Sequence, residues 1–169
     1  LAAGPGRSFA IHAFPGYTGG LWASKGLSIL DYGVCWEGYA SDCTITVAKD
    51  PSPQQMELLN LVQTAADQCR KLYMPGKKIS EAVAKADEIF ASAGRSMPHG
   101  LGHGTGLEIH EAPFVSKRSA ADKVFVPGNI ITLEPGLYDP VLGGVRHEND
   151  VLITENGNDL LLNSKIFIL

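Results

Sequence analysis

The 169-residue chain has few of the features that mark secreted, membrane-bound or nucleic-acid-binding proteins. It contains only three cysteines, an odd number without the spacing of a zinc knuckle, which predicts reduced thiols and no disulfide framework. Its net charge is −4 without any block of like charges, so the sequence predicts neither a nucleic-acid nor a membrane partner. No apolar run approaches the length of a membrane span, and no signal peptide is recognisable. These absences favour an enzyme domain of the cytoplasm.

The composition that is present can form one sizeable core. Hydrophobic residues make up 44% of the chain, and no repeat divides it, so we expect residues 1–169 to form a single domain. The middle of the chain predicts two amphipathic helices that serve as scaffold. The first begins at Ser52-Pro53 and ends at Pro75-Gly76, and the second begins at Ser80-Glu81 and ends at Gly94.

The segment 99–113 concentrates unusual residues in a short stretch. It holds three of the five histidines, His99, His103 and His110, interleaved with four glycines. Because glycine loses the most backbone freedom on folding, this density suggests close approach to a ligand or a metal. A glycine-rich loop with surface histidines is the alternative interpretation. Carboxylates elsewhere in the chain favour the first interpretation.

Two aspartates flank a predicted hairpin. Asp31 follows a short apolar run, and Asp42 precedes residues 44–47, whose alternation is typical of a strand. A turn at Trp36-Glu37-Gly38 would pair these strands and bring the two carboxylates side by side.

Two glutamates accompany strands later in the chain. Glu134 ends the β-type run 130–133, and Glu148 leads into the strand-like run 151–154. An unpaired carboxylate is costly to bury beside an apolar strand. One such acid is usually a salt-bridge or turn residue, whereas four of them with a histidine-rich segment indicate bound cations.

Together these residues resemble the ligand set of the pita-bread metallopeptidases, which include methionine aminopeptidases, aminopeptidase P and prolidase. As in that family, the two aspartates lie eleven positions apart. The segment 102–111 resembles the family's metal-histidine motif, and segments 132–138 and 144–150 resemble its two glutamate motifs. In chain order the matching ligands are Asp31, Asp42, His103, Glu134 and Glu148.

The resemblance implies an α+β pita-bread fold, a curved antiparallel sheet with helices on its outer face and two divalent metal ions in its concavity. Oxygen ligands with a single imidazole suit Mn²⁺, and Co²⁺, Fe²⁺ or Zn²⁺ could also be accommodated. Four carboxylates balance the charge of two such ions. By resemblance, Asp42 and Glu148 bridge both metals, and Asp31 completes one of them. His103 and Glu134 complete the other.

The resemblance also implies roles for the residues around the metals. Glu134 is expected to accept and donate the catalytic proton, and His110 to contact the substrate and stabilise the tetrahedral intermediate. His12 is expected to share in catalysis by binding and positioning the substrate. His99 is placed with the substrate-binding residues, where it would support the site by hydrogen bonding. His147 stands where the family usually carries an aliphatic residue, and we expect no role for it.

One spacing indicates a branch of the family. Only fourteen residues separate Glu134 from Glu148, and Arg146 lies two residues before the second glutamate. This compact pattern resembles bacterial Xaa-Pro peptidases, in which Arg146 would bind substrate, orient a carboxylate, or do both. Glu111 is expected either at the rim or behind the ligands as a supporting acid, and it could help to receive the α-amino group of the substrate. The implied activity is metal-dependent hydrolysis between an N-terminal residue and a following proline in a small peptide, as in Xaa-Pro dipeptidases and aminopeptidase P.

Several alternatives stay open. Methionine aminopeptidases and creatinase-like hydrolases share the fold, so the fold does not fix the substrate. A non-catalytic pita-bread binding module, or an inactive fragment, is a further alternative. The chain starts without Met, where the family's domain is already under way, which predicts an N-terminally truncated catalytic domain; a homodimer could cover the surface this exposes. The loop 15–22 departs from common family sequences.

Overall fold

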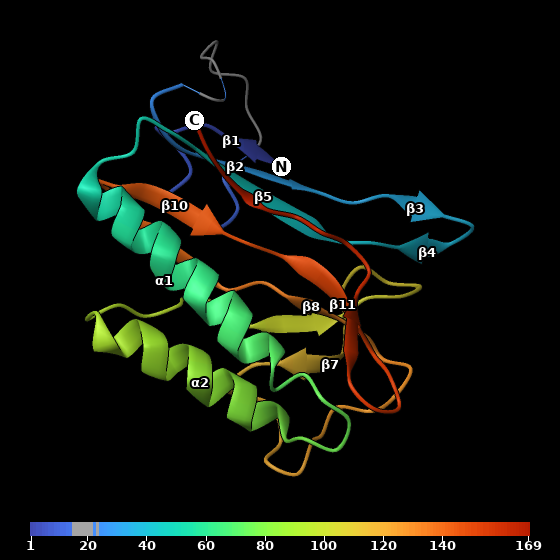
Figure 1. Ribbon diagram of the computed structural model, residues 1–169. Helices are drawn as coiled ribbons and strands as arrows, with labels where there is room; N and C mark the ends of the chain where they lie inside the picture. Colours follow the sequence, from blue (N-terminus) through green and yellow to red (C-terminus); the bar gives the residue numbers. More distant parts are fainter. Residues whose placement is uncertain (15–21, 23) are drawn as a thin grey trace.

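The computed structural model describes residues 1–14, 22 and 24–169 (Figure 1). These residues form both helices and strands, which confirms the predicted α+β class. Neither helix of the described chain is long and apolar enough to cross a membrane. In chain order the elements are β1 (Ala2–Ala3), β2 (Gly26–Tyr32), β3 (Cys35–Trp36), β4 (Tyr39–Ala40), β5 (Cys43–Lys49), α1 (Pro53–Arg70), α2 (Ile79–Ser92), β6 (Gly102–Gly104), β7 (Glu111–Val115), β8 (Ile130–Leu133), β9 (Gly136–Asp139), β10 (Gly143–Arg146), β11 (Asn149–Ile153), β12 (Asn158–Leu160) and β13 (Ile166–Ile168).

Two larger sheets carry most of the strands. The first has the order β1-β2-β5-β13 and the second β12-β11-β8-β6-β7, with the ribbons β9–β10 and β3–β4 beside them. Strand pairs are antiparallel except at β13, which runs parallel to β5. The sheets are therefore antiparallel, as expected, apart from this edge, where β13 is reached by a crossover from the second sheet and not by a hairpin from β5.

The first helix begins where the sequence predicts and ends earlier. The Ser52 side chain accepts a hydrogen bond from the Gln55 backbone, and the Gln55 side chain accepts one from the Ser52 backbone, which completes a capping box. The helix ends at Arg70 and does not continue to Pro75-Gly76, as the sequence predicted. The Asn158 amide donates to the carbonyls of Arg70 and Tyr73, at 3.1 and 3.0 Å, and so takes up acceptors that the helix end leaves free.

The second helix begins at Ile79, one residue before the predicted Ser80 start, and has no side-chain N-cap. A tertiary contact fixes this end instead, because the Ile79 N–H donates to the Lys123 carbonyl at 3.0 Å. The helix ends at Ser92, and Gly94 follows in the left-handed conformation with φ of 66°, as expected for a glycine after a helix.

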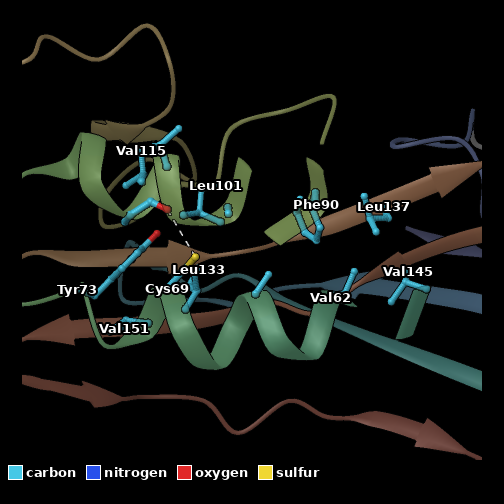
Figure 2. Packing of buried hydrophobic residues seen from close by; sticks show 14 of the residues in the cluster. Val62, Cys69, Tyr73, Phe90, Leu101, Val115, Leu133, Leu137, Val145 and Val151 are labelled. Atoms are coloured by element: carbon cyan, nitrogen blue, oxygen red, sulfur yellow. Dashed lines mark hydrogen bonds between the residues drawn. The ribbon is translucent and has the colours of Figure 1, made fainter. Parts of the chain in front are cut away.

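The two helices lie side by side against one face of the sheets and bury the main core (Figure 1). Figure 2 shows Val62 and Cys69 of α1 packed among strand side chains such as Leu133. The Cys69 thiol donates to the Ala82 carbonyl of α2 at 3.5 Å, which joins the two helices. The apolar stripes predicted for both helices are thus core-facing.

Strand β5 of the first sheet meets the segment 146–148, which leads from β10 into β11 of the second sheet, through side chains and backbone. Thr44 Oγ1 donates to Glu148 Oε2 at 2.6 Å, and the Glu148 N–H donates to the Thr44 carbonyl at 3.1 Å. Two residues further along β5, Thr46 Oγ1 donates to the Arg146 carbonyl at 2.8 Å. These four residues, Thr44, Thr46, Arg146 and Glu148, form what we call the inter-sheet seam. All four are buried, so the seam brings polar groups of distant segments together in the interior.

Candidate metal centre

The predicted aspartate hairpin is present. β2 pairs with β5 so that Asp31 faces Thr44 across the ladder, and β3–β4 extends the pair to a turn at Glu37 and Gly38. Both turn residues have positive φ, 50° and 88°, the conformation that a two-residue hairpin turn requires. Carboxylate oxygens of Asp31, Asp42 and Glu148 lie within 4.8 Å of one another. The hairpin therefore places the two aspartates side by side, as predicted.

The glycines around His103 permit close backbone contacts. β6 lies between β7 and β8, and a Cβ added at Gly102 would lie 1.9 Å from the Thr132 carbonyl oxygen. A larger residue would push β6 away from β8, which carries Thr132 and is followed by Glu134. The glycine-rich segment is thus partly a buried strand, and the alternative of a surface loop is wrong for this part.

The orientation of the His103 ring favours a cation. Its Nδ1 lies 3.0 Å from the Gly104 carbonyl, to which it can only donate, so the neutral ring presents the Nε2 lone pair on its other side. Nε2 lies 3.5 Å from Glu134 Oε1 and 3.7 Å from Asp42 Oδ2. Burial lowers the pKa of His103, so the ring is neutral at physiological pH. A lone pair facing two carboxylates is unfavourable unless a proton or a metal cation lies between them, and a metal cation would meet all three groups at once.

The remaining predicted ligands complete two overlapping groups. Atoms of His103, Glu134 and Glu148 lie within 4.8 Å of one another, as do atoms of Asp31, Asp42 and Glu148. Glu148 belongs to both groups. The structure thus brings all five predicted ligands to one place, and the hard oxygen donors with one imidazole fit a pair of divalent cations.

The pKa values of the clustered carboxyls are raised, which shows that their charged forms are unfavourable without cations. Burial raises the pKa of Glu134 to about 8 against the opposing effect of Arg146, and the charges of Asp42 and Asp31 raise it further. Burial also raises the pKa of Glu148 and of Asp42, and each is raised further by a neighbouring carboxylate. Bound cations would relieve both the desolvation and the mutual repulsion.

These shifts predict how the stability of the metal-free protein depends on pH. Because the pKa of Glu134 is higher in the folded chain than its ordinary 4.5, folding favours its protonated form, and this stability is lost as the pH rises toward 8. Folding lowers the pKa values of His99 and His103, so these two groups make the stability rise with pH, but only below their ordinary pKa of 6.5. In chelator, the melting temperature should therefore fall between pH 6.5 and 8. The Glu134→Gln variant should show a smaller fall, and an equal fall in both proteins would contradict the assignment.

Arg146 is committed to protein groups. Its guanidinium is 2% exposed and contacts Asp31 Oδ2, while Nε donates to Thr44 Oγ1 at 3.0 Å and an Nη donates to Tyr138 OH at 2.9 Å. This arrangement orients the Asp31 carboxylate, one of the two roles expected for Arg146. Its contact with substrate stays a prediction.

Tyr138 extends this network to His99. His99 Nδ1 lies 2.7 Å from the Gly100 carbonyl and so carries the proton, which leaves Nε2 to accept from Tyr138 OH at 3.0 Å. Burial lowers the pKa of His99 to about 4, so the ring is neutral. His99 therefore supports the site by hydrogen bonding, 3.8 Å from Glu134 Oε2.

The cluster faces a cavity of about 390 Å³, which we call the ligand cavity. His12 and His110 both line it, together with the five predicted ligands and Arg146. The His110 ring lies 4.3 Å from the His103 ring, centroid to centroid, in an edge-on arrangement. The structure thus gathers His12 and His110 at the mouth of the cluster, where a substrate would enter.

Glu111 and His147 do not line this cavity. The Glu111 carboxylate accepts from the Glu108 N–H at 3.1 Å and fills the space beside Gly106, so it closes the turn that carries His110 and does not face the cluster. Of the two positions expected for Glu111, this contact fits the supporting one, and its contact with a substrate amine stays a prediction. His147 is buried with Nε2 at 2.9 Å from the Ser164 carbonyl, away from the cavity. Of the loop 15–22, only Trp22 belongs to the described residues.

Several site residues were not predicted from the sequence. Thr44 and Tyr138 hold Glu148 and His99, respectively, and Asp150 accepts the Asp42 N–H at 3.0 Å while 3% exposed. Burial raises the pKa of Asp150 to about 6. One signal was available in the sequence. Thr44 and Thr46 lie two positions apart on the strand after Asp42 and therefore share a face, and two buried hydroxyls on one face need hydrogen-bond partners.

Comparison with known proteins gives the class of the chain. Residues 2–155 match the sequence profile of Metallopeptidase family M24, and the chain therefore belongs to this family. It is 42% identical over 144 residues to the uncharacterized peptidase YqhT of Bacillus subtilis, and 42% identical over 134 residues to the Xaa-Pro dipeptidase of Pyrococcus furiosus. These alignments cover 83% and 78% of this chain, and 40% and 38% of the relatives.

Solved structures confirm the pita-bread fold. The prolidase from Pyrococcus horikoshii OT3 is similar with a TM-score of 0.89 at 34% identity, over 97% of this chain and 47% of that one. The X-Pro aminopeptidase from Thermotoga maritima MSB8 is similar with a TM-score of 0.89 at 30% identity, over 100% of this chain and 48% of that one. The chain thus spans less than half the length of the proteins it matches.

Proposed function

We propose that the chain is the metal-dependent hydrolase portion of an Xaa-Pro peptidase, which cleaves the bond between an N-terminal residue and a following proline. The observation that carries this proposal is the convergence of Asp31, Asp42, His103, Glu134 and Glu148, with the His103 Nε2 lone pair directed at carboxylates. The relatives support the proline preference, since they include Xaa-Pro dipeptidases and an X-Pro aminopeptidase.

Two divalent ions, of which Mn²⁺ suits the donors well, would polarise the scissile carbonyl and lower the pKa of water when bound. Asp31, Asp42 and Glu148 would hold one ion, and Asp42, Glu148, His103 and Glu134 would hold the other. Arg146 holds the Asp31 carboxylate in one orientation, and Thr44 does the same for Glu148. Both acids are thereby fixed before any ion binds.

The proton steps fall to Glu134, and substrate contacts to the histidines. The Glu134 carboxylate lines the ligand cavity beside His103 and would take a proton from water and deliver it to the departing proline nitrogen. His110, on the turn closed by Glu111, would donate a hydrogen bond to the oxygen that gains charge as the carbonyl is attacked. His12 and His99 border the same cavity and would position the peptide.

Metal content and turnover together test this proposal. We expect elemental analysis to find two metals per chain after Mn²⁺ addition, and the protein to hydrolyse Ala-Pro but neither Met-Ala nor creatine. Cleavage of Met-Ala or creatine instead would assign a methionine aminopeptidase or a creatinase-like hydrolase. Metal binding without any cleavage would indicate an inactive fragment. A chain that binds no metal would be a non-catalytic binding module.

A further inference from the structure

The segment 161–165 passes the backbone of Glu148 on its way from one sheet to the other. It leaves β12 at the edge of the second sheet and leads into β13 at the edge of the first (Figure 1). The Leu161 N–H donates to the Asp150 carbonyl at 2.9 Å, and Ser164 contacts each of the residues 147–149. The crossover thus contacts Glu148, which belongs to both groups that the five predicted ligands form.

Ser164 uses all of its polar groups on this stretch. Its Oγ donates to the Glu148 carbonyl at 2.5 Å, and its N–H donates to Asn149 Oδ1 at 2.7 Å. Its carbonyl oxygen lies 2.9 Å from His147 Nε2, and because a carbonyl only accepts, Nε2 carries the proton and donates. His147 and Asn149 are both buried. We call His147, Asn149 and Ser164 the clamp.

The clamp and the inter-sheet seam hold Glu148 from two directions. On the seam side, the Glu148 N–H donates to the Thr44 carbonyl at 3.1 Å, and the Glu148 carboxylate accepts from Thr44 Oγ1 at 2.6 Å. On the clamp side, the Glu148 carbonyl accepts from Ser164. Both backbone groups of Glu148 are therefore bound, one to β5 and the other to the crossover before β13. A metal ligand held by such outer hydrogen bonds keeps one orientation, and loss of the outer partner weakens metal binding.

His147 is a costly residue at its position. Its Nδ1 is buried and has no hydrogen-bond partner among the residues that the structure describes. A buried polar atom without a partner destabilises the fold, and the aliphatic residue usual at this place in similar sequences would avoid that cost. An aliphatic side chain could not, however, donate to the Ser164 carbonyl. The bond to Ser164 therefore accounts for a histidine to which the sequence alone assigned no role.

We propose that the clamp is a positioning device for the metal centre, which fixes the backbone of Glu148 so that its carboxylate is in place before either ion binds. Of the described residues that form candidate ligand groups, none is a clamp residue. Ser164 also lies outside residues 2–155, which match the family profile. The inference rests on the proposed function for the two metal positions alone, and it is independent of the substrate.

Metal affinity tests the clamp. In calorimetric titrations with Mn²⁺, Ser164→Ala should bind about tenfold more weakly than the wild-type protein, a loss typical when the partner of a metal ligand is removed. Ser164→Thr keeps the hydroxyl and should restore most of the wild-type affinity. Lys165→Ala changes the exposed neighbour of Ser164 and should leave the Kd for Mn²⁺ unchanged.

A second variant separates positioning from a purely structural role. His147→Leu removes the buried unpaired nitrogen together with the bond to Ser164, so its melting temperature in chelator should change little. Its Kd for Mn²⁺ should nevertheless rise about tenfold. A structural role alone would lower the melting temperature in chelator and leave the Kd unchanged.

Equal Mn²⁺ affinity in the wild-type, Ser164→Ala and His147→Leu proteins would overturn the inference, as would an equal loss of affinity in Lys165→Ala. Hydrolysis of Ala-Pro by the wild-type protein reports on the proposed function separately. If the wild-type protein binds Mn²⁺ but cleaves no peptide, the proposed function fails, and the affinities of the variants still decide the inference. If the wild-type protein binds no Mn²⁺, both are overturned.

Discussion

Replacement of His110 by alanine is expected to lower kcat by about 10²–10⁴-fold while two metals remain bound. The ring lies beside the cluster, 4.3 Å from the His103 ring. It belongs to neither of the two groups that the five predicted ligands form, His103–Glu134–Glu148 and Asp31–Asp42–Glu148. Its loss should therefore remove a hydrogen bond that forms as the carbonyl is attacked, without loss of the ions. Steady-state kinetics on an Xaa-Pro peptide, together with elemental analysis of the same sample, would measure both quantities.

A loop variant controls for a general disturbance of this segment. Leu107 lies on the same turn, is 68% exposed and does not line the ligand cavity, so Leu107→Ala should keep near wild-type turnover. Wild-type kcat in the His110→Ala variant would remove the proposed role. Loss of metal from that variant would instead make His110 a ligand, since its ring also lies within 4.8 Å of Asp42 and His103 ligand atoms.

Removal of the metals is expected to lower the melting temperature as well as abolish activity. An ion present at about 100 times its Kd stabilises a folded protein by about 2.7 kcal/mol, which corresponds to roughly 5–10 °C for a chain of this size. The effect should be large here because the pKa values of Glu134, Glu148 and Asp42 are all raised in the metal-free cluster. Thermal unfolding in Mn²⁺ and in chelator measures the difference.

Two variants sharpen this measurement. Glu148→Gln keeps an acceptor for Thr44 Oγ1 but removes a charge shared by both ligand groups, so its melting temperature should respond little to Mn²⁺. Glu81→Gln changes an exposed acid 3.7 Å from Lys77, far in sequence from the cluster, and should respond as the wild-type protein does. An unchanged melting temperature of the wild-type protein in chelator would count against a preformed pair of sites.

The sequence predicted the parts of the site whose signals are local. The aspartate hairpin follows from strand-like alternation and a turn at Glu37-Gly38, and those two elements fix where Asp31 and Asp42 lie. The histidine and glutamate positions followed from a resemblance in ordered motifs. Neither line of reasoning needed the tertiary structure, and the predicted residues do converge.

The parts that could not be predicted depend on contacts between segments far apart in the chain. Nothing local to Arg146 shows that its guanidinium is occupied by Asp31, Thr44 and Tyr138. The direction of the Glu111 carboxylate depends on the turn at Gly106, which its motif does not specify. The early end of α1 likewise depends on Asn158, from the other end of the chain.

The inter-sheet seam also has a consequence for how the chain acquires its site during synthesis. Its bonds join residues about a hundred positions apart, with a separation of 104 for Thr44–Glu148 and 100 for Thr46–Arg146. Contacts this distant in sequence form slowly, because the chain between them must first be brought together. On a growing chain the aspartate hairpin can fold early, but Asp31 can pair with Arg146 only after residue 146 has emerged from the ribosome. Assembly of the proposed metal centre therefore follows synthesis of the segment that carries Arg146 and Glu148.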